Sequence, residues 1–472
     1  MYYTHDMAIN IASKDINRSA SNRSNIGMDS RAERTKMPPL FESKTMSNAP
    51  LIIRGGNPVS GVLPVNPSKN AALPIIAASL LIDEPIILHG VPRLSDMECI
   101  LEIVKSLGAN WEWISQHSLR IHTPEITSIE APYSLVSKMR ASFNVLGPLL
   151  ARAGEAHVSM PGGCSFGVRP VDQHVKALRA MGATVVENNG DFIAVRDRPL
   201  TGRFVFDLLT VGGTQNAISA ATLGTGIVRL ENASIDPDVI DLCNFLNSMG
   251  AKIHGVGTHT LEVEGVEKLH GGEYRISPDR LEAATFMLIT AATRGVLTLE
   301  NANLDHLRSV TAKLIEAGVN VLEMDNTTIR IDASSNKFNP LHLSVAEFPG
   351  FPTDVQPMMS AFLATVPGTS RITDRIYTTR FGYSAELNRL GAKTEVLDSS
   401  ILIEGTKLHG APVKAMDIRG GAALVVAATA SEGETRIQGV EFLNRGYENL
   451  EQRLRSIGVD TTRDGLRLAN VG

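Results

Sequence analysis

The sequence predicts a two-domain α/β protein in which strands wrap around buried helices. Two repeated elements support this fold class: a helix that stops at a glycine, and an alanine-rich helix that leads into a strand. Each element occurs six times along the chain, in phase with the other. The third observation is length, because 472 residues exceed what one hydrophobic core usually serves.

The first repeated element is a helix-like segment that ends at a glycine followed by Ala or Val. Its copies lie roughly 70 residues apart, and their glycines are Gly108, Gly182, Gly250, Gly318, Gly391 and Gly458. Each glycine fits the left-handed residue that ends a helix. A short β-rich stretch follows in most copies, as at residues 184–187 and 252–254, so a helix-to-strand turn is expected at these glycines.

The second repeated element is an apolar helix that leads through a turn into a strand. The helices are predicted at residues 70–81, 143–153, 214–223, 282–292, 356–365 and 422–430, and the strands at 85–88, 156–159, 227–231, 296–300, 370–373 and 435–438. These helices are apolar on nearly every face, so they should be buried on nearly every face. Six units, three to a domain, suit two α/β domains with threefold pseudosymmetry.

The predicted domain organisation has three parts. Residues 1–48 are rich in Ser, Asn, Arg and Asp and show no apolar period, so we expect a disordered N-terminal extension. One domain is predicted at residues 69–278, and it carries the cysteine loop described below. The other combines residues 49–68 with residues 279–472 and is therefore discontinuous.

Composition excludes several classes of protein. A net charge of -5 argues against a nucleic-acid binder, and an aromatic content of 5% weakens any model of base stacking. Three widely spaced cysteines indicate neither a disulfide framework nor a zinc site, and they fit a reducing cytoplasm. The apolar runs are too short to span a membrane. We expect a cytoplasmic monomer that acts on small molecules without a metal or other cofactor.

A glycine-rich loop at residues 161–172, Pro-Gly-Gly-Cys-Ser-Phe-Gly-Val-Arg-Pro-Val-Asp, is the first candidate for chemistry. Its glycines cannot sustain a helix or a regular strand, so Cys164 is expected near solvent. The charge of Arg169 would favour the thiolate. The alternative is a tight turn that carries an inert cysteine. Inert cysteines are usually buried in apolar surroundings, however, so we interpret the loop as an active-site lid.

Charged and polar residues stand at the starts of the predicted buried helices. They are Lys69 with Asn70, Arg140, Thr210, Asp279 with Arg280 and Glu282, Asp354, and Asp417 with Arg419. Helix N-termini attract anions, and helix capping is an equally good explanation for acidic residues such as Asp279. A cation at a helix start opposes the helix dipole. Lys69, Arg140 and Arg419 therefore predict an anionic ligand.

Seven motifs occur in order along the chain: Ser68-Lys-Asn-Ala-Ala-Leu-Pro74, Met139-Arg-Ala-Ser142, Pro161-Gly-Gly-Cys164 with Arg169-Pro-Val-Asp172, Phe351-Pro-Thr-Asp354, Arg380-Phe381, Asp417-Ile-Arg419 and Arg445-Gly-Tyr-Glu448. Together they resemble the UDP-N-acetylglucosamine 1-carboxyvinyltransferases of the enolpyruvyl transferase family. The cysteine loop separates this group from its shikimate-pathway relative. The resemblance implies a pair of inverted α/β barrels of the EPSP synthase type, built from six βαβαββ-type units.

The implied activity is transfer of enolpyruvyl from phosphoenolpyruvate to the 3-hydroxyl of UDP-N-acetylglucosamine, with release of phosphate, in peptidoglycan precursor synthesis. By position, Lys69, Arg169 and Arg445 would bind phosphoenolpyruvate, and Arg380 and Arg419 would assist. So many cations suit a small trianion, because carboxylate and phosphate groups accept paired hydrogen bonds from arginine.

The resemblance also implies catalytic roles. Cys164 would deliver a proton to the methylene carbon, or add to the adjacent carbon, as the loop closes. Asp354 would take the proton of the sugar hydroxyl, and Asn70 would position that hydroxyl. Asp417 would handle a proton or orient Arg445. The remaining implied substrate contacts are Arg140, Arg169, Pro170, Val171, Asp172, Gln173, Thr210, Val211, Gly212 and Ile376, while His174 is expected to be structural.

Three positions depart from the family pattern. Val65-Asn-Pro-Ser68 replaces a Ser-Gly turn, Gly420-Gly421 replaces bulkier residues, and Leu208 stands where a lysine often binds the diphosphate. Leu208 keeps open an alternative: a paralogue that transfers enolpyruvyl to another nucleotide, such as UMP, in nucleoside antibiotic biosynthesis.

Two other classes fit the sequence less well. A non-catalytic binding protein on this fold is expected to have lost Cys164, Asp354 or Lys69, and all three are present. A kinase or dehydrogenase would need a phosphate-binding loop after a strand. The cluster Gly224-Thr-Gly226 lacks that pattern.

Overall fold

The computed structural model describes residues 49–162, 171–335 and 337–464. The predicted N-terminal extension therefore lies outside the described residues, and so do Cys164, Arg169 and Pro170 of the cysteine loop. All the elements discussed below belong to one compact unit of the chain, Ser43–Gly472.

The buried helices lie where the alanine-rich repeats predicted them. They are α2 (Lys69–Ala78), α5 (Leu146–Ala153), α7 (Val211–Thr222), α9 (Arg280–Ala292), α11 (Gln356–Leu363) and α13 (Ile418–Ala430). The 3-10 turn η1 (Ser79–Leu81) extends α2, and η2 (Arg140–Val145) precedes α5. In α9 every residue from Leu281 to Ala292 is buried. The prediction of helices without an exposed face is thus confirmed.

The glycine-terminated helices are also found. They are α3 (Ser95–Ser106), α6 (Asp172–Ala180), α8 (Pro237–Ser248), α10 (Arg308–Glu316), α12 (Ser384–Arg389) and α15 (Leu450–Ser456). The six predicted glycines adopt φ angles from +88° at Gly391 to +121° at Gly108. Residues with a Cβ rarely adopt such angles, so glycine is needed at each helix end. The remaining short helices are α4 (Tyr133–Val136), η3 (Leu304–Leu307) and α14 (Val440–Leu443).

The described strands form six sheets, and five of these share one pattern. In that pattern a parallel edge strand is followed by two antiparallel pairings. For example, β9 (Gly202–Val205) runs parallel to β10 (Ile227–Glu231), which pairs antiparallel with β12 (Thr260–Glu264), and β12 pairs antiparallel with β11 (Lys252–His254). The chain order β9-α7-β10-α8-β11-β12 is the predicted βαβαββ unit.

Four more sheets repeat this arrangement. They are β13 (Gly272–Arg275), β3 (Ile86–His89), β5 (Ser118–His122) and β4 (Asn110–Trp113); β2 (Ser60–Pro64), β14 (Val296–Glu300), β16 (Ile329–Asp332) and β15 (Asn320–Glu323); β17 (His342–Val345), β18 (Thr369–Asp374), β20 (Ser400–Glu404) and β19 (Lys393–Leu397); and β21 (Pro412–Lys414), β22 (Gly433–Gln438), β1 (Leu51–Gly55) and β23 (Asp460–Arg463). The three-stranded sheet of β6 (Glu155–Ser159), β8 (Asp191–Val195) and β7 (Thr184–Asn188) has a single parallel bridge, Glu130 to His157, in place of the edge strand.

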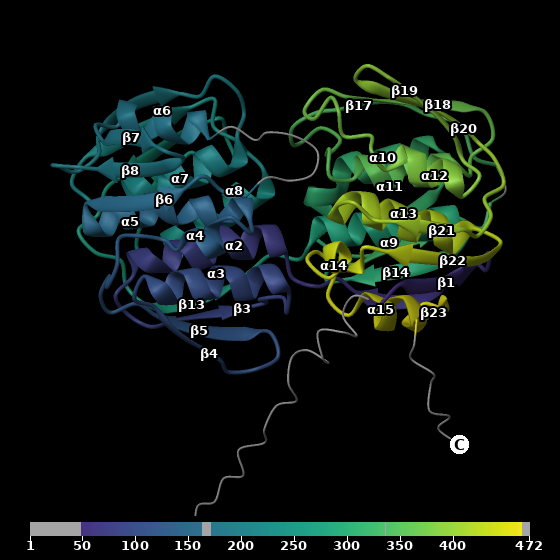
Figure 1. Cartoon of the computed structure of the whole chain (residues 1–472), viewed down its shortest axis with the longest axis horizontal. Helices are drawn as coiled ribbons and strands as arrows, with labels where there is room; N and C mark the ends of the chain where they lie inside the picture. The colour runs from purple at the N-terminus through teal and green to yellow at the C-terminus, as the bar shows by residue number, and fades with distance from the viewer. Residues whose placement is uncertain (1–48, 163–170, 336, 465–472) are drawn as a thin grey trace, which may run out of the picture. The chain divides into compact units, whose positions relative to one another are not determined.

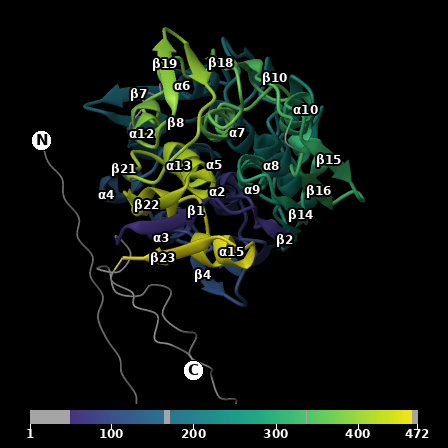
Figure 2. The same cartoon turned by 90° about the vertical axis from the view of Figure 1, so that its right-hand side faces the viewer.

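Buried apolar side chains gather in two clusters. One contains residues between Ala71 and Ile276, and the other combines residues 51–65 with residues between Leu281 and Val459. In the second cluster α9, α11 and α13 pack on one another, and Figure 1 shows them between the β17–β20 sheet and the strands β1, β14 and β22. The view of Figure 2 again shows α9 and α13 inside, with β14, β16, β18 and β22 around them. We propose that the two clusters are the cores of the two predicted domains.

The chain passes between the two clusters twice, and the two crossings lie side by side. The Ser68 N–H donates to the carbonyl oxygen of Ser277 at 2.8 Å, and the Asp279 N–H donates to that of Asn66 at 2.7 Å. Pro67 and Pro278 pair between them as an antiparallel bridge. The proline in the unusual segment Val65-Asn-Pro-Ser68 therefore sits in the crossing itself.

Candidate active site at the starts of the buried helices

Lys69 begins α2 and shares one carboxylate with an arginine from the far end of the chain. The Lys69 Nζ lies 3.0 Å from Asp96 Oδ2, and the Arg445 Nε lies 2.8 Å from Asp96 Oδ1. Lys69 and Asp96 are both buried. Burial alone would raise the pKa of Asp96, but the charges of Lys69 and Arg445 outweigh it and lower that pKa. The structure therefore brings together two of the cations predicted to bind phosphoenolpyruvate.

Asp354 pairs with two more of the predicted cations. It lies just before α11, and its carboxylate is 2.6 Å from the Arg380 Nη1 and 3.2 Å from the Arg419 Nε. Both arginines are buried, and Asp354 is partly exposed. Burial acts to lower the pKa of Arg419, but the charge of Asp354 prevails and raises it. A partly exposed carboxylate between buried guanidinium groups can meet a substrate and remain fixed in direction.

Tyr447 joins these two groups. Its hydroxyl accepts a hydrogen bond from the Arg419 Nη1 at 3.4 Å and lies 2.8 Å from the Thr285 Oγ1. Only one residue separates Tyr447 from Arg445 in the chain. The short chain segment from Arg445 to Tyr447 therefore links the Asp96 group to the Asp354 group.

The predicted nucleotide contacts gather at the starts of α6 and α7. Thr210 caps α7, and its Oγ1 accepts from the Gly213 N–H at 3.2 Å. The Gln173 side chain spans to Asp207 just before this cap, donating to Oδ2 at 2.8 Å and accepting from the backbone N–H at 3.0 Å. A Cβ at Gly212 would stand 3.2 Å from the His174 ring, which is tighter than most Cβ contacts, so glycine eases the approach of α6 and α7 here.

His174 and Arg140 also belong to the group of residues at the starts of α6 and α7, which is the third group of the candidate site after those of Asp96 and Asp354. The His174 Nδ1 is hydrogen bonded to Asn216 at 2.9 Å, and its ring packs edge-on against Phe143. Burial, assisted by the charge of Arg140, lowers the pKa of His174 to about 3. A neutral buried histidine fits the predicted structural role. Arg140 opens η2, which packs on α2 and so connects the third group to Lys69.

Asp417 is held in place by its own helix. Its Oδ1 accepts from the N–H groups of Arg419 at 2.9 Å and Gly420 at 3.0 Å, which makes it the N-cap of α13. The carboxylate that the structure places on Arg445 is Asp96, and orientation of Arg445 by Asp417 stays a prediction. A role of Asp417 in proton handling stays a prediction.

The unusual glycines after Arg419 are explained by packing. A Cβ at Gly420 would lie 2.9 Å from Asp417 Oδ2 and 3.3 Å from Tyr383, and one at Gly421 would lie 3.1 Å from both Ala415 and Leu443. Neighbouring side chains fill the room that bulkier residues would need.

Two other implied residues lie beside these groups. Asn70 follows Lys69 in the first turn of α2. The Ile376 N–H donates to Asp374 Oδ1 at 2.9 Å, four residues before Arg380. Both residues therefore stand close in the chain to predicted cations, and their substrate contacts stay predictions.

Sequence reasoning missed Asp96 and Tyr447. The only local signal for Asp96 was an acidic residue in the first turn of α3, which is common wherever a helix dipole is balanced. Tyr447 stood inside a recognised motif, and nothing in its spacing indicated which arginine it would contact.

Leu208, the main departure from the family pattern, has a side chain that is 55% exposed. The preceding residue, Asp207, forms an ion pair with Lys176 at 2.7 Å, and Lys176 also lies 3.2 Å from Asp172. A lysine is therefore present beside the predicted nucleotide contacts, although it belongs to α6.

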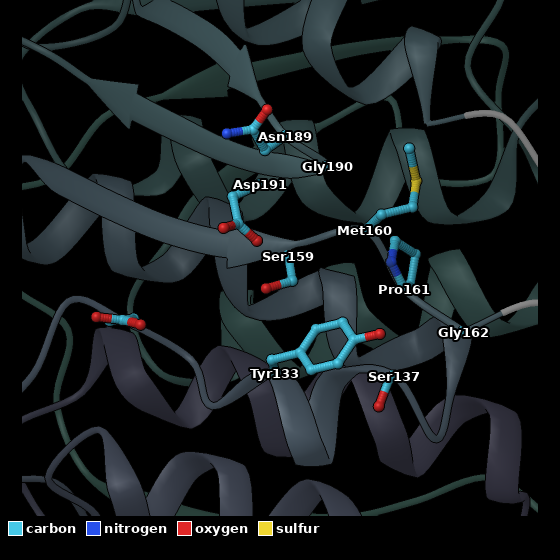
Figure 3. A pocket seen from close by; sticks show the side chains of 10 residues that line it. Tyr133, Ser137, Ser159, Met160, Pro161, Gly162, Asn189, Gly190 and Asp191 are labelled. Atoms are coloured by element: carbon cyan, nitrogen blue, oxygen red, sulfur yellow. The ribbon is translucent and has the colours of Figure 1, made fainter.

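A separate hollow opens near the point where the chain reaches the cysteine loop (Figure 3). Tyr133, Ser159, Pro161, Gly162 and Asp191 are among its lining residues. None of the predicted site residues that the structure describes lines it. We therefore place the candidate site at the helix starts, where the charged groups converge.

The described residues also bear on two other features, metal sites and membrane-spanning helices. It contains no cluster of three His, Cys, Asp or Glu side chains that could hold a metal ion. No helix within residues 49–162, 171–335 and 337–464 has the length and apolar character needed to cross a membrane.

Comparison with known proteins agrees with this architecture. The family model of EPSP synthase (3-phosphoshikimate 1-carboxyvinyltransferase) matches residues 53–454. Among solved structures, the enolpyruvyl transferase NikO from Streptomyces tendae is similar with a TM-score of 0.78 at 23% identity, covering 88% of this chain and 98% of that one. An EPSP synthase from Acinetobacter baumannii reaches 0.70 at 17% identity, covering 88% and 100%. These likenesses confirm the predicted fold.

Similarity in sequence is much higher to one group of proteins. A protein named UDP-N-acetylglucosamine 1-carboxyvinyltransferase from Deinococcus radiodurans is 58% identical over 88% of this chain and 97% of its own length. One of the same name from Thermus thermophilus is 53% identical over 86% and 95%. The chain therefore belongs to the EPSP synthase family and, within it, to the UDP-N-acetylglucosamine 1-carboxyvinyltransferases.

Proposed function

We propose that this chain transfers enolpyruvyl from phosphoenolpyruvate to the 3-hydroxyl of UDP-N-acetylglucosamine and releases phosphate. The observation that carries the proposal is the pairing of four cations with two carboxylates: Lys69 and Arg445 with Asp96, and Arg380 and Arg419 with Asp354. Preorganised cations of this kind suit a small substrate with a phosphate and a carboxylate. The names of the relatives at 53–58% identity supply the acceptor.

Asp354 is the proposed base for the sugar hydroxyl. Its carboxylate is partly exposed and is aimed by Arg380 and Arg419, so it can receive a proton without moving. Cys164 is proposed to protonate the methylene carbon of phosphoenolpyruvate or to add to the adjacent carbon. Lys69 and Arg445, with Arg169, are proposed to hold the phosphate and carboxylate.

The nucleotide is proposed to lie along Arg140 and the starts of α6 and α7. The implied contacts there are Arg169, Pro170, Val171, Asp172, Gln173, Thr210, Val211 and Gly212. The exposed backbone N–H groups of a helix start suit the diphosphate of a UDP-sugar. The cytoplasmic location and monomeric state expected from the sequence remain part of this proposal.

Phosphate release from phosphoenolpyruvate tests the acceptor directly. The assay would compare UDP-N-acetylglucosamine with a panel of other UDP-sugars, UDP and UMP. We expect UDP-N-acetylglucosamine to give the highest kcat/KM. A higher value with UMP would overturn the proposal in favour of a paralogue that acts on another nucleotide.

Leu208→Lys tests the diphosphate contact in the same assay. A charged hydrogen bond gained at this position is worth roughly 1.5 to 3 kcal/mol, or about ten- to a hundredfold in affinity. We expect KM for UDP-N-acetylglucosamine to fall while kcat changes little, because the diphosphate is remote from the reacting hydroxyl. Leu322→Lys, at an exposed position on β15, is the matched control and should leave KM unchanged. An unchanged KM in Leu208→Lys would mean that the diphosphate does not reach this position.

A further inference from the structure

The turn Arg445–Glu448 connects α14 to α15 and reaches residues of the other hydrophobic cluster at both of its ends. Arg445 contacts Asp96, as described above. Glu448 accepts from the Arg93 N–H at 2.8 Å through Oε2, and its Oε1 lies 3.0 Å from the His117 Nε2. Glu448 is only 7% exposed. A carboxylate buried so far from its own cluster needs these partners to offset its desolvation.

Several contacts hold together the surface that receives Glu448. The Arg93 guanidinium lies 3.4 Å above the Trp113 ring, and its nitrogens donate to the carbonyl oxygens of Gln116 and Ser115 at 2.6 and 3.1 Å. The backbone oxygen of His117 accepts from the N–H groups of Gly90 and Val91. The Arg93 side chain and the His117 backbone are therefore held at the β4–β5 hairpin.

The middle of the turn is fixed from the opposite side. Tyr447 is buried among the residues of its own cluster, and its hydroxyl contacts Thr285 and Arg419. Arg445 thus stands on a short turn whose end is held by Glu448 and whose middle is held by Tyr447. Its direction depends on both.

We propose that Glu448 is a positioning residue that aims the Arg445 guanidinium at the Lys69 and Asp96 group by anchoring the turn to Arg93 and His117. The inference rests on the proposed function, in which Arg445 binds phosphoenolpyruvate. Neither the family resemblance nor the predicted site assigned Glu448 a role. Losing the anchor lets the turn rotate, so Arg445 meets the substrate less often in the right direction.

Glu448→Gln tests this role with little change of shape. The amide oxygen can still accept from the Arg93 N–H, but the charge facing His117 is gone. We expect KM for phosphoenolpyruvate to rise about tenfold, with kcat within about twofold and KM for the nucleotide sugar unchanged. Glu441→Gln, on the exposed face of the neighbouring helix α14, is the matched control and should leave all three constants unchanged.

The Arg445→Ala background separates positioning from a general structural role. If Glu448 acts through Arg445, Glu448→Gln should raise KM for phosphoenolpyruvate by less than about twofold in that background. An unchanged KM in the single variant, or the same increase with and without Arg445, would overturn the inference. The proposed function fails separately, and visibly, if the unmodified protein releases no phosphate.

Discussion

Asp96 and Asp354 each pair with two basic side chains, so the two carboxylates offset part of the positive charge of these four cations. In each group, attraction to the shared carboxylate offsets the repulsion between its two cations. An anionic substrate must then compete with Asp96 for Lys69 and Arg445 or lie beside it. This arrangement explains how buried cations at helix starts, which oppose the helix dipole, are tolerated before a ligand arrives.

Cys164 is expected to be the only readily alkylated thiol. Burial raises the pKa of Cys99 and raises that of Cys243 to about 12, so neither forms much thiolate near neutral pH. Cys164 lies outside the described residues, and its reactivity stays a prediction from its glycine-rich, arginine-containing loop. Incubation with the epoxide fosfomycin should place one adduct on Cys164 and stop turnover. Mass spectrometry that locates the adduct on Cys99 or Cys243 instead would contradict this.

Glu282 should make stability depend on pH. Burial raises its pKa to about 7 despite the nearby charge of Arg453. A raised pKa means that the folded state binds the proton more tightly than the unfolded state does. The stabilisation is therefore full below the unfolded pKa and is lost as pH rises through about 7, with a loss of about 3 kcal/mol between pH 4 and pH 8.

Glu282→Gln provides the comparison for this pH dependence, because its amide oxygen can still accept from the Asn66 N–H. Denaturant unfolding would be measured for both proteins at several pH values. The unfolding free energy of the unmodified protein minus that of the variant should fall by about 3 kcal/mol from pH 4 to pH 8. A difference that does not vary with pH would show that Glu282 stays ionised in the folded protein.

At the scale of single elements, the helix-ending glycines divide into two kinds. Gly458 has a φ of +93°, and a Cβ there would have no heavy atom within 4 Å, so its requirement is conformational only. Gly108 has a φ of +121°, and a Cβ there would lie 2.2 Å from the carbonyl oxygen of Glu125. The same sequence signal thus serves backbone conformation in one repeat and close packing in another.

Alanine substitution should separate the two kinds. Gly458→Ala is expected to cost about 1–2 kcal/mol of unfolding free energy, the cost of a left-handed residue with a Cβ. Gly108→Ala adds a clash with backbone and should cost about 3 kcal/mol or more. Chemical denaturation of both variants checks the order. Equal losses would mean that the segment around Glu125 shifts easily to accept the methyl group.

At the scale of the whole molecule, the proposed site draws residues from both hydrophobic clusters. Lys69 and Asp96 accompany the first cluster, while Asp354, Arg419 and Arg445 accompany the second. Within the described residues, the chain passes between the clusters at the paired crossings of Pro67 and Pro278. Two adjacent chain segments can act as a hinge that lets the two clusters close on a ligand.

Closure should be measurable by small-angle X-ray scattering. The radius of gyration should decrease when UDP-N-acetylglucosamine is added, because the proposed site takes groups from both clusters. UDP, which lacks the sugar that carries the reacting hydroxyl, is the control and should give a smaller change. Equal radii with and without the nucleotide sugar would contradict the expected motion.

The sequence by itself determined the repeated architecture, because its causes are local. A glycine needed for a left-handed helix end and a helix apolar on every face can be recognised from a few neighbouring residues, and both recur in phase. The sequence also located Lys69, Asp354 and Arg419, since cations and carboxylates at the starts of apolar helices are unusual enough to notice.

Only the tertiary structure decided which charges meet. Asp96 and Arg445 are 349 residues apart, and His117 and Glu448 are 331 apart, and no periodicity or spacing links such positions. A charged side chain at a helix start can be satisfied by its own cap, as Asp417 is, or by a partner from another repeat, as Asp354 is. Which of the two partners a side chain finds depends on how the six units pack. Electrostatic pairing requires proximity in space, and the local sequence does not indicate which distant residue will be near.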